Sequence, residues 1–130
     1  MAVAAVLTPA GCSLGADEEP RPATGAPAEI AAVVQRLERA TAERDWATIC
    51  SDLFTAAARE RAGGANCTRL LREAGADVRR PAIEIRGIRV REGGRASVTV
   101  RTRAEGQQAV SDVLELRSQD GEWRVEALSG

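Results

Sequence analysis

Histidine, lysine and tyrosine are absent from this sequence of 130 residues, so all of its basic residues are arginines. Without histidine the chain has no Ser/His or Cys/His nucleophile pair and no imidazole ligand for zinc. Without lysine it has neither a Schiff-base nucleophile nor the lysine of a phosphate-binding loop. Catalysis would have to use carboxylates, arginines, hydroxyls or thiols, and we expect no metal and no cofactor.

Aromatic residues are scarce as well, and neither sign of charge is in marked excess. The aromatic side chains are Trp46, Phe54 and Trp123, and the net charge is −1 with arginines interleaved among Asp and Glu. Nucleic-acid binding needs a basic surface, and single strands also need stacking aromatics. We therefore exclude nucleic acid as a partner. The bias towards Arg, Ala, Gly and Pro fits a high-GC bacterium.

The N-terminal segment has the order of a bacterial lipoprotein signal peptide. Small apolar residues over positions 1–11 precede Cys12, and a polar, Pro-rich stretch follows. We expect residues 1–12 to be a signal remnant with an acylated cysteine, 13–26 a flexible tether and 27–130 one folded domain. The protein would then lie outside the cytoplasm, lipid-anchored to the cell membrane or secreted. The alternative is an apolar tail with an incidental thiol.

Helical periodicity runs through the first half of the predicted domain. Apolar residues recur there at spacings of three and four, with charged residues between them. Pro27 suits a first helical position, and Asp45, Thr55 and Asn66 are residue types that cap helix starts. We therefore expect four helices, over residues 27–44, 45–54, 55–62 and 66–75.

Cys50 and Cys67 both fall on apolar helical faces. Cys50 shares its face with Trp46, Ile49, Leu53 and Phe54, and Cys67 opens a face with Leu70, Leu71 and Ala74. Both thiols point inward, and an oxidising compartment favours a disulfide worth ~3 kcal/mol. The alternative is two buried free thiols. A catalytic thiol is disfavoured because no histidine is present to activate it.

A period of two replaces the helical period after Pro81. Ile83 and Ile85 alternate with charged residues, and the phase shifts at Gly87, which indicates a β-bulge. Turn sequences at 92–94, 106–108 and 120–121 separate four strands, the last with Trp123, Val125 and Ala127 on its apolar face. The fold class is α+β, with N-terminal helices packed on a curved four-stranded antiparallel sheet.

Helices followed by a meander that closes on Asp-Gly-Glu-Trp-Arg-Val at 120–125 resemble the nuclear transport factor 2-like superfamily. This superfamily includes ketosteroid isomerase and the polyketide cyclases. The chain is similar in particular to its small bacterial lipoproteins, in which cysteines on the second and third helices are linked. The resemblance implies a cone with a pocket for a small apolar molecule. Enzymes of the superfamily place an aspartate with tyrosine or histidine in that pocket, and this chain has neither partner.

Asp112 interrupts the apolar face that Val110, Leu114 and Leu116 form on the third strand. Inside the cone it would be a general base or ligand anchor, whereas a bulge or early turn would send it to water, which we favour. Trp46 and Trp123 would line the pocket mouth, although core packing is the commoner role of such residues. The sheet arginines fit solvation and edge protection better than an anionic partner; they include Arg86, Arg89, Arg101, Arg103 and Arg124.

These features predict a membrane-tethered, extracytoplasmic binding or interaction module of the cell envelope, without enzymatic activity. Its partner would be a small apolar ligand or an envelope protein. The alternative is an isomerase, cyclase or dehydratase that uses Asp112. A cone filled with side chains, which spaces or docks other envelope proteins, is a third possibility.

Overall fold

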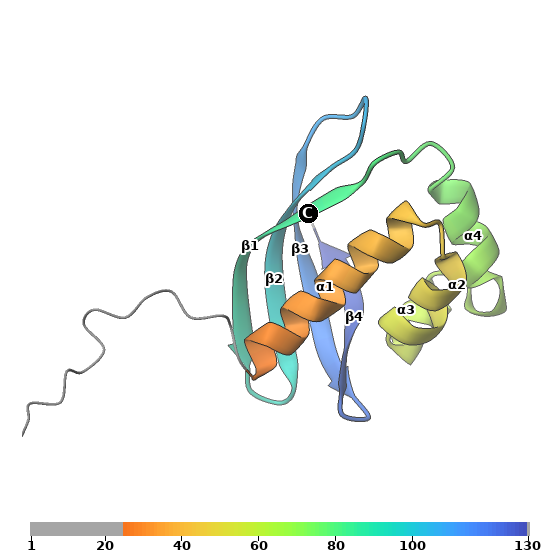
Figure 1. Cartoon of the computed structure of the whole chain (residues 1–130). Coiled ribbons are helices and arrows are strands. Elements are labelled where there is room, and N and C mark those ends of the chain that lie inside the picture. The colour runs from red at the N-terminus through yellow and green to blue at the C-terminus, as the bar shows by residue number, and fades with distance from the viewer. Residues whose placement is uncertain (1–24, 130) are drawn as a thin grey trace, which may run out of the picture.

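The computed structural model describes residues 25–129. A layer of helices packs on one face of a four-stranded antiparallel sheet, with strand order β1-β2-β3-β4 (Figure 1). The predicted α+β class is confirmed. The predicted signal remnant with Cys12 and nearly all of the predicted tether lie outside the described residues. The elements are α1 Ala26–Ala42, α2 Trp46–Thr48, η1 Ile49–Leu53, α3 Ala56–Arg61, η2 Gly64–Asn66, α4 Cys67–Ala74, β1 Ala82–Arg91, β2 Arg95–Arg103, β3 Val110–Gln119 and β4 Glu122–Ser129.

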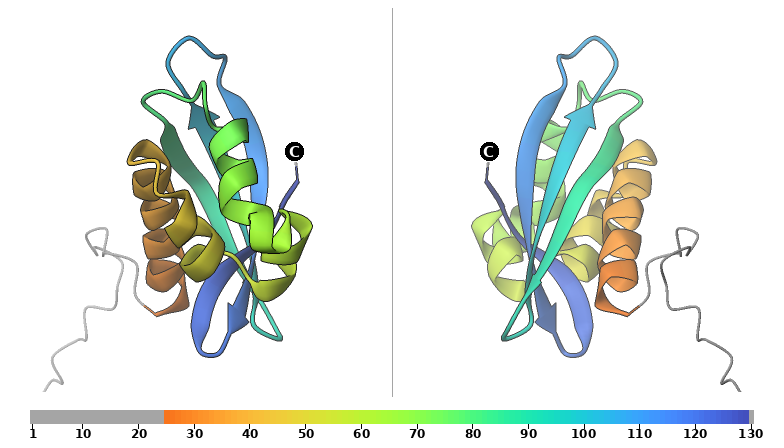
Figure 2. Two further views of the ribbon diagram at one scale, coloured as in Figure 1. Left: turned by 90° about the vertical axis from the view of Figure 1, so that its right-hand side faces the viewer. Right: turned by 90° about the vertical axis from the view of Figure 1, so that its left-hand side faces the viewer.

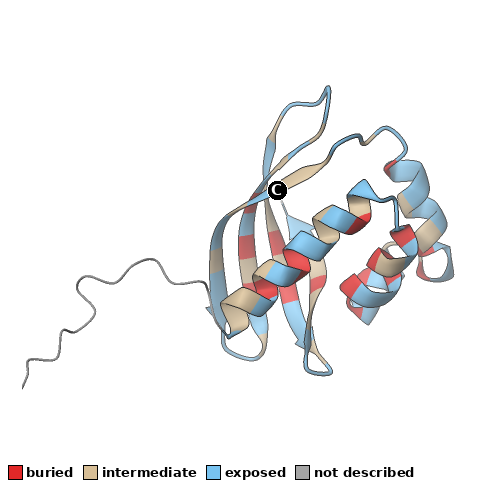
Figure 3. Cartoon of the chain, in the orientation of Figure 1, coloured by how far each residue is buried: buried red, intermediate tan, exposed pale blue. Residues whose placement is uncertain are grey.

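The long helix α1 crosses the sheet and buries one stripe of its surface on it (Figure 3). Pro27 lies in its first turn, where a missing backbone N–H breaks no helical bond. Ile30, Val33 and Val34 meet the inner face of the sheet in one core cluster. Glu38 accepts a hydrogen bond from the backbone N–H of Ile83 at 2.6 Å. A charged side chain of α1 therefore helps to hold the start of β1.

The second expected helix is confirmed but is not uniform. The carboxylate of Asp45 caps it by accepting from the backbone N–H of Thr48 at 3.2 Å. After α2 the backbone widens into the π-helix η1. The chain then becomes extended at Phe54, which forms a β-bridge with Val125, and the backbone N–H of Thr55 donates to the Val125 carbonyl at 3.0 Å. This segment therefore covers part of the free edge of β4.

Asn66 is the N-cap residue of the last helix, as predicted, but its side chain does not cap the helix. Asn66 closes the 3-10 turn η2, and its side chain makes no capping hydrogen bond. The predicted burial of Leu70 and Ala74 is wrong, because both are exposed. Helix α4 lies at the outside of the molecule (Figure 2), so only the side that begins at Cys67 is covered.

The disulfide between Cys50 and Cys67 is confirmed. Its S–S bond is 2.03 Å long, and the two Cα atoms are 6.1 Å apart, within the usual range. Both cysteines are buried. The bridge therefore ties η1 directly to the start of α4.

The sheet has the register that the alternation predicts, with one exception in β4. The bulge near Gly87 is confirmed by the register shift that follows Ile85. In β4 a second shift pairs Val125 with Leu116 but Leu128 with Leu114. The expected apolar alternation through Ala127 is therefore wrong, because one extra residue at the shift changes which side chains face the helices. The buried inner face consists of Ala96, Val98, Val100, Leu114, Leu116 and Val125.

Candidate ligand-binding site

An apolar cavity of about 420 Å³ lies between the helices and the last two strands. Its size falls in the range of small-molecule sites, which is roughly 300 to 1,000 Å³. Leu128 is 62% exposed and lines it, so the cavity reaches solvent beside β4. Its wall consists of Leu37, Thr41, Trp46, Ile49, Phe54, Ala58, Arg61, Ala62, Leu71, Leu114, Val125, Glu126, Ala127 and Leu128.

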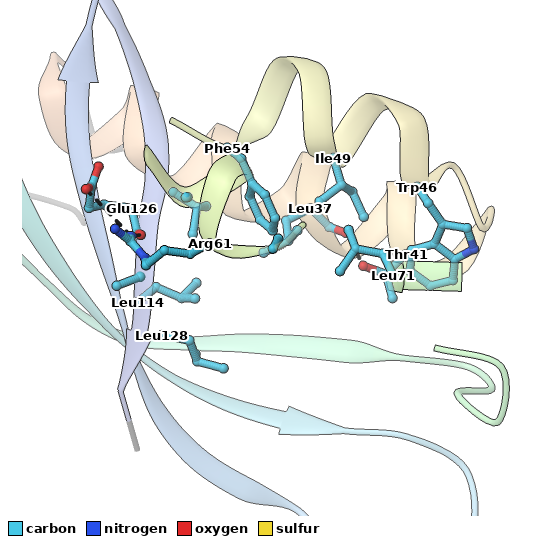
Figure 4. Close-up of a pocket in the computed structure, with 14 residues that line it drawn as sticks. Leu37, Thr41, Trp46, Ile49, Phe54, Arg61, Leu71, Leu114, Glu126 and Leu128 are labelled. Atoms are coloured by element: carbon cyan, nitrogen blue, oxygen red, sulfur yellow. Dashed lines mark hydrogen bonds and ion pairs between the residues drawn. The ribbon is translucent and has the colours of Figure 1, made fainter. Parts of the chain in front are cut away.

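The cavity is elongated, with Trp46 and Leu71 at one end and an ion pair at the other (Figure 4). The guanidinium of Arg61 lies 3.6 Å from the carboxylate of Glu126 and also donates to its backbone carbonyl. The hydroxyl of Thr41 donates to the Leu37 carbonyl at 2.7 Å, within its own helix. The remaining side chains of the wall are hydrocarbon or aromatic. The cavity therefore favours an apolar body over a polar one.

Trp46 forms its end of the cavity because a glycine lies behind the indole ring. Trp46 is buried, and a Cβ atom placed on Gly75 would lie 2.4 Å from its Cη2 atom and 2.8 Å from Cζ2. No side chain larger than hydrogen fits there without moving the ring. Gly75 was expected to end α4, which it does, but its contact with Trp46 gave no sequence signal.

Asp112 lies in β3 directly opposite Val100, a fully buried residue of the inner face. The side chain is half-buried. Leu114, two residues further along β3, lines the cavity, whereas Asp112 does not. Asp112 therefore lies at an inner-face position of β3, as the alternation predicts, but it is not part of the cavity wall.

Trp123 is also separate from the cavity wall. It lies in β4 opposite Ser118 and packs, half-buried, against the main core cluster. Of the three residues proposed for a pocket, Trp46 alone lines this cavity. Sequence reasoning missed the contribution of Leu128, because the register shift in β4 left no mark in the spacing of apolar residues.

Arg124 differs from the solvated role expected of the sheet arginines. Its side chain is 19% exposed, and it donates to the carbonyls of Ser51 at 3.0 Å and Phe54 at 3.4 Å. These carbonyls lie at the end of η1, where a cation is favourable. A second nitrogen of the guanidinium pairs with Glu122 at 3.1 Å. Arg124 therefore fixes η1, and with it the roof of the cavity, to β4.

Within residues 25–129, no three acidic, cysteine or histidine side chains gather as ligands for a metal ion. In the same part of the chain, every helix is too short or too polar to cross a membrane.

Several solved structures are similar to this chain, and three of them each have a TM-score of 0.54. The first is a SEC-C motif-containing protein from Rhodopseudomonas palustris, 19% identical over 76% of this chain and 76% of that one. The second, from Campylobacter jejuni, is named as a candidate nuclear transport factor 2-like transpeptidase and is 16% identical over 79% of this chain and 99% of that one. The third is a nuclear transport factor 2-like protein of unknown function from Shewanella baltica, 18% identical over 83% and 99% of the respective chains.

No protein-family model and no curated protein matches the sequence. At identities below one fifth, the structural likeness shows a shared fold alone.

Proposed function

We propose that this chain, which has the nuclear transport factor 2-like fold, is a membrane-tethered, extracytoplasmic binding module whose cavity holds a small apolar ligand. The observation that supports the ligand is the apolar cavity between Leu37 of α1, Trp46 of α2 and Leu114 of β3. The order of apolar segment, Cys12 and polar tether supports the envelope location.

The chemistry of the wall favours binding rather than turnover. A ligand that buries about 200 Å² of apolar surface there gains roughly 5 kcal/mol before the cost of association. The carboxylate of Glu126 is held by Arg61 at one end, and the Thr41 hydroxyl is bonded within α1. The wall therefore presents no free acid or base beside the apolar body of a ligand.

Titration with N-phenyl-1-naphthylamine, a neutral apolar fluorophore, tests this function. We expect saturable binding with one probe per chain. Ala58 is buried in α3 and lines the cavity, so Ala58→Leu fills part of it and weakens binding by at least about tenfold. The matched control is Ala57→Leu, an exposed neighbour on the same helix, which leaves binding unchanged. Equal affinity of the two variants, or no saturable binding, contradicts the proposal.

The second candidate for the binding partner is an envelope protein. Leu128 is an exposed hydrophobic residue at the cavity mouth, where an apolar side chain of a partner would enter. An isomerase, cyclase or dehydratase that uses Asp112 has less support, because that carboxyl group does not line the cavity. Turnover that disappears in Asp112→Asn, with the fold intact, would favour the enzyme.

A further inference from the structure

Four arginines lie directly opposite one another across all four strands. Arg91 of β1 pairs with Arg95 of β2, Arg95 pairs with Arg117 of β3, and Arg117 pairs with Arg124 of β4. We call these four residues the arginine row. Their neighbours Ala96, Leu116 and Val125 belong to the buried inner face, so the row lies on the outer face of the sheet.

The arginine row is expected to destabilise the sheet. Like charges that face each other on neighbouring strands repel and destabilise the pairing. Arg124 is compensated by Glu122 and by the carbonyls of η1. Within residues 25–129, no ion pair joins Arg91, Arg95 or Arg117 to a carboxylate. Among the described residues, three exposed guanidinium groups therefore have no carboxylate partner.

The surroundings of the row are mixed in charge. Arg89 lies in the next row, opposite Ser97, whose hydroxyl donates to Glu115 at 3.0 Å. Glu92 and Asp120 lie in the two hairpin turns. The attraction for anions is therefore confined to a short strip of the surface. Such a strip suits a partner that is held close by other means better than a polyanion captured from solution.

The row lies at the end of the sheet where the chain enters the domain. Arg91 and Arg95 flank the β1–β2 turn, and Arg117 and Arg124 lie near the β3–β4 turn. Helix α1 begins at this same end of the sheet (Figures 1 and 2). The predicted tether leads into α1 at Ala26 and would therefore deliver the domain with this end towards its anchor.

We infer that the arginine row docks on the anionic headgroups of the membrane to which the chain is tethered. This inference rests on the proposed anchor at Cys12. Residues 13–25, which precede α1, span at most roughly 45 Å when extended, so the domain stays within reach of the surface. Guanidinium groups bind phosphate oxygens with paired hydrogen bonds, and the anchor raises the local concentration of headgroups. The net charge of −1 makes a soluble polyanion the poorer partner.

Vesicle sedimentation tests the inference on the full chain with Cys12→Ser, which cannot be acylated there. The vesicles are phosphatidylcholine with or without 30% phosphatidylglycerol. We expect binding that needs phosphatidylglycerol and weakens in high salt. The triple variant Arg91→Gln, Arg95→Gln, Arg117→Gln reduces partitioning by about 100-fold, from about fivefold for each arginine.

The matched control removes the same charge at exposed positions outside the row, with Arg79→Gln, Arg101→Gln and Arg103→Gln. Arg103 lies opposite Ala82, at the far end of the sheet. The inference is overturned if this control loses as much binding as the row variant, if pure phosphatidylcholine binds equally, or if soluble polyphosphate binds more tightly than the vesicles.

A stability measurement gives a second, independent readout. Arg95 faces an arginine on both sides, so Arg95→Gln relieves two repulsive pairs and raises the melting temperature. A lower melting temperature would mean that the row is structural and would overturn the inference. Cavity titration and detection of acylation at Cys12 test the proposed function separately, because neither depends on the outer face of the sheet.

Discussion

At the scale of single residues, Gly75 determines the position of the largest side chain in the cavity wall. The indole of Trp46 occupies the space where a Cβ atom on residue 75 would lie. The same glycine ends α4, where its carbonyl accepts from Arg44 at 3.3 Å. This one small residue therefore ends a helix, takes part in a contact between helices and determines the shape of the cavity.

Gly75→Ala is expected to destabilise the domain by ~1 to 3 kcal/mol, because the added methyl overpacks against Trp46. The displaced indole also weakens binding of N-phenyl-1-naphthylamine. Urea unfolding measures the first effect, and Trp46 fluorescence in a Trp123→Phe background follows the ring. Gly87→Ala is the control, since its Cβ atom meets nothing within 4 Å. Equal effects of the two alanines would show that the contact with Trp46 is not the cause.

At the scale of elements, the helical layer is held by a few specific links rather than by a large core. The disulfide ties η1 to α4, Arg124 ties η1 to β4, and Arg44 donates to the carbonyls of Ala76 and Val78 after α4. The core of this layer is small, with Ala40, Trp46, Ile49 and Leu53 as its buried members. These links therefore determine whether the roof of the cavity persists.

Reduction of the bridge between Cys50 and Cys67 is expected to lower the free energy of unfolding by ~3 kcal/mol, from the entropy of closing a separation of 17 residues. Urea titrations with and without reductant measure this difference. The double variant Cys50→Ala, Cys67→Ala serves as the control, because its stability does not respond to reductant. A reductant effect of the same size in the double variant would assign the loss to another cause.

At the scale of the whole molecule, the proposed function holds one domain beside a bilayer surface by means of a lipid anchor. The cavity and the arginine row belong to opposite faces of the same sheet. Docking of the outer face would therefore leave the cavity mouth at Leu128 free for a ligand.

Intact-mass measurement of the protein from the membrane fraction of its native host tests the anchor. We expect a chain that lacks residues 1–11, carries acyl groups on Cys12 and has lost two hydrogens to the disulfide. After a high-salt wash, which weakens electrostatic binding to headgroups, the variant Cys12→Ser is expected in the soluble fraction. Retention of residues 1–11 with an unmodified Cys12 would contradict the anchor and, with it, the orientation proposed for the arginine row.

The sequence by itself determined the class of fold and the bulge near Gly87, and it favoured a disulfide between Cys50 and Cys67 over two free thiols. These features follow from local chemistry, since apolar periodicity sets which face of a helix or strand is buried. Only the tertiary structure decided that Trp46 rests on Gly75, that Leu128 rather than Ala127 shares the inner face with Leu114, and that Arg124 bonds to η1. The physical reason is that contacts between distant segments depend on register and on the space left by neighbours, which no local spacing records.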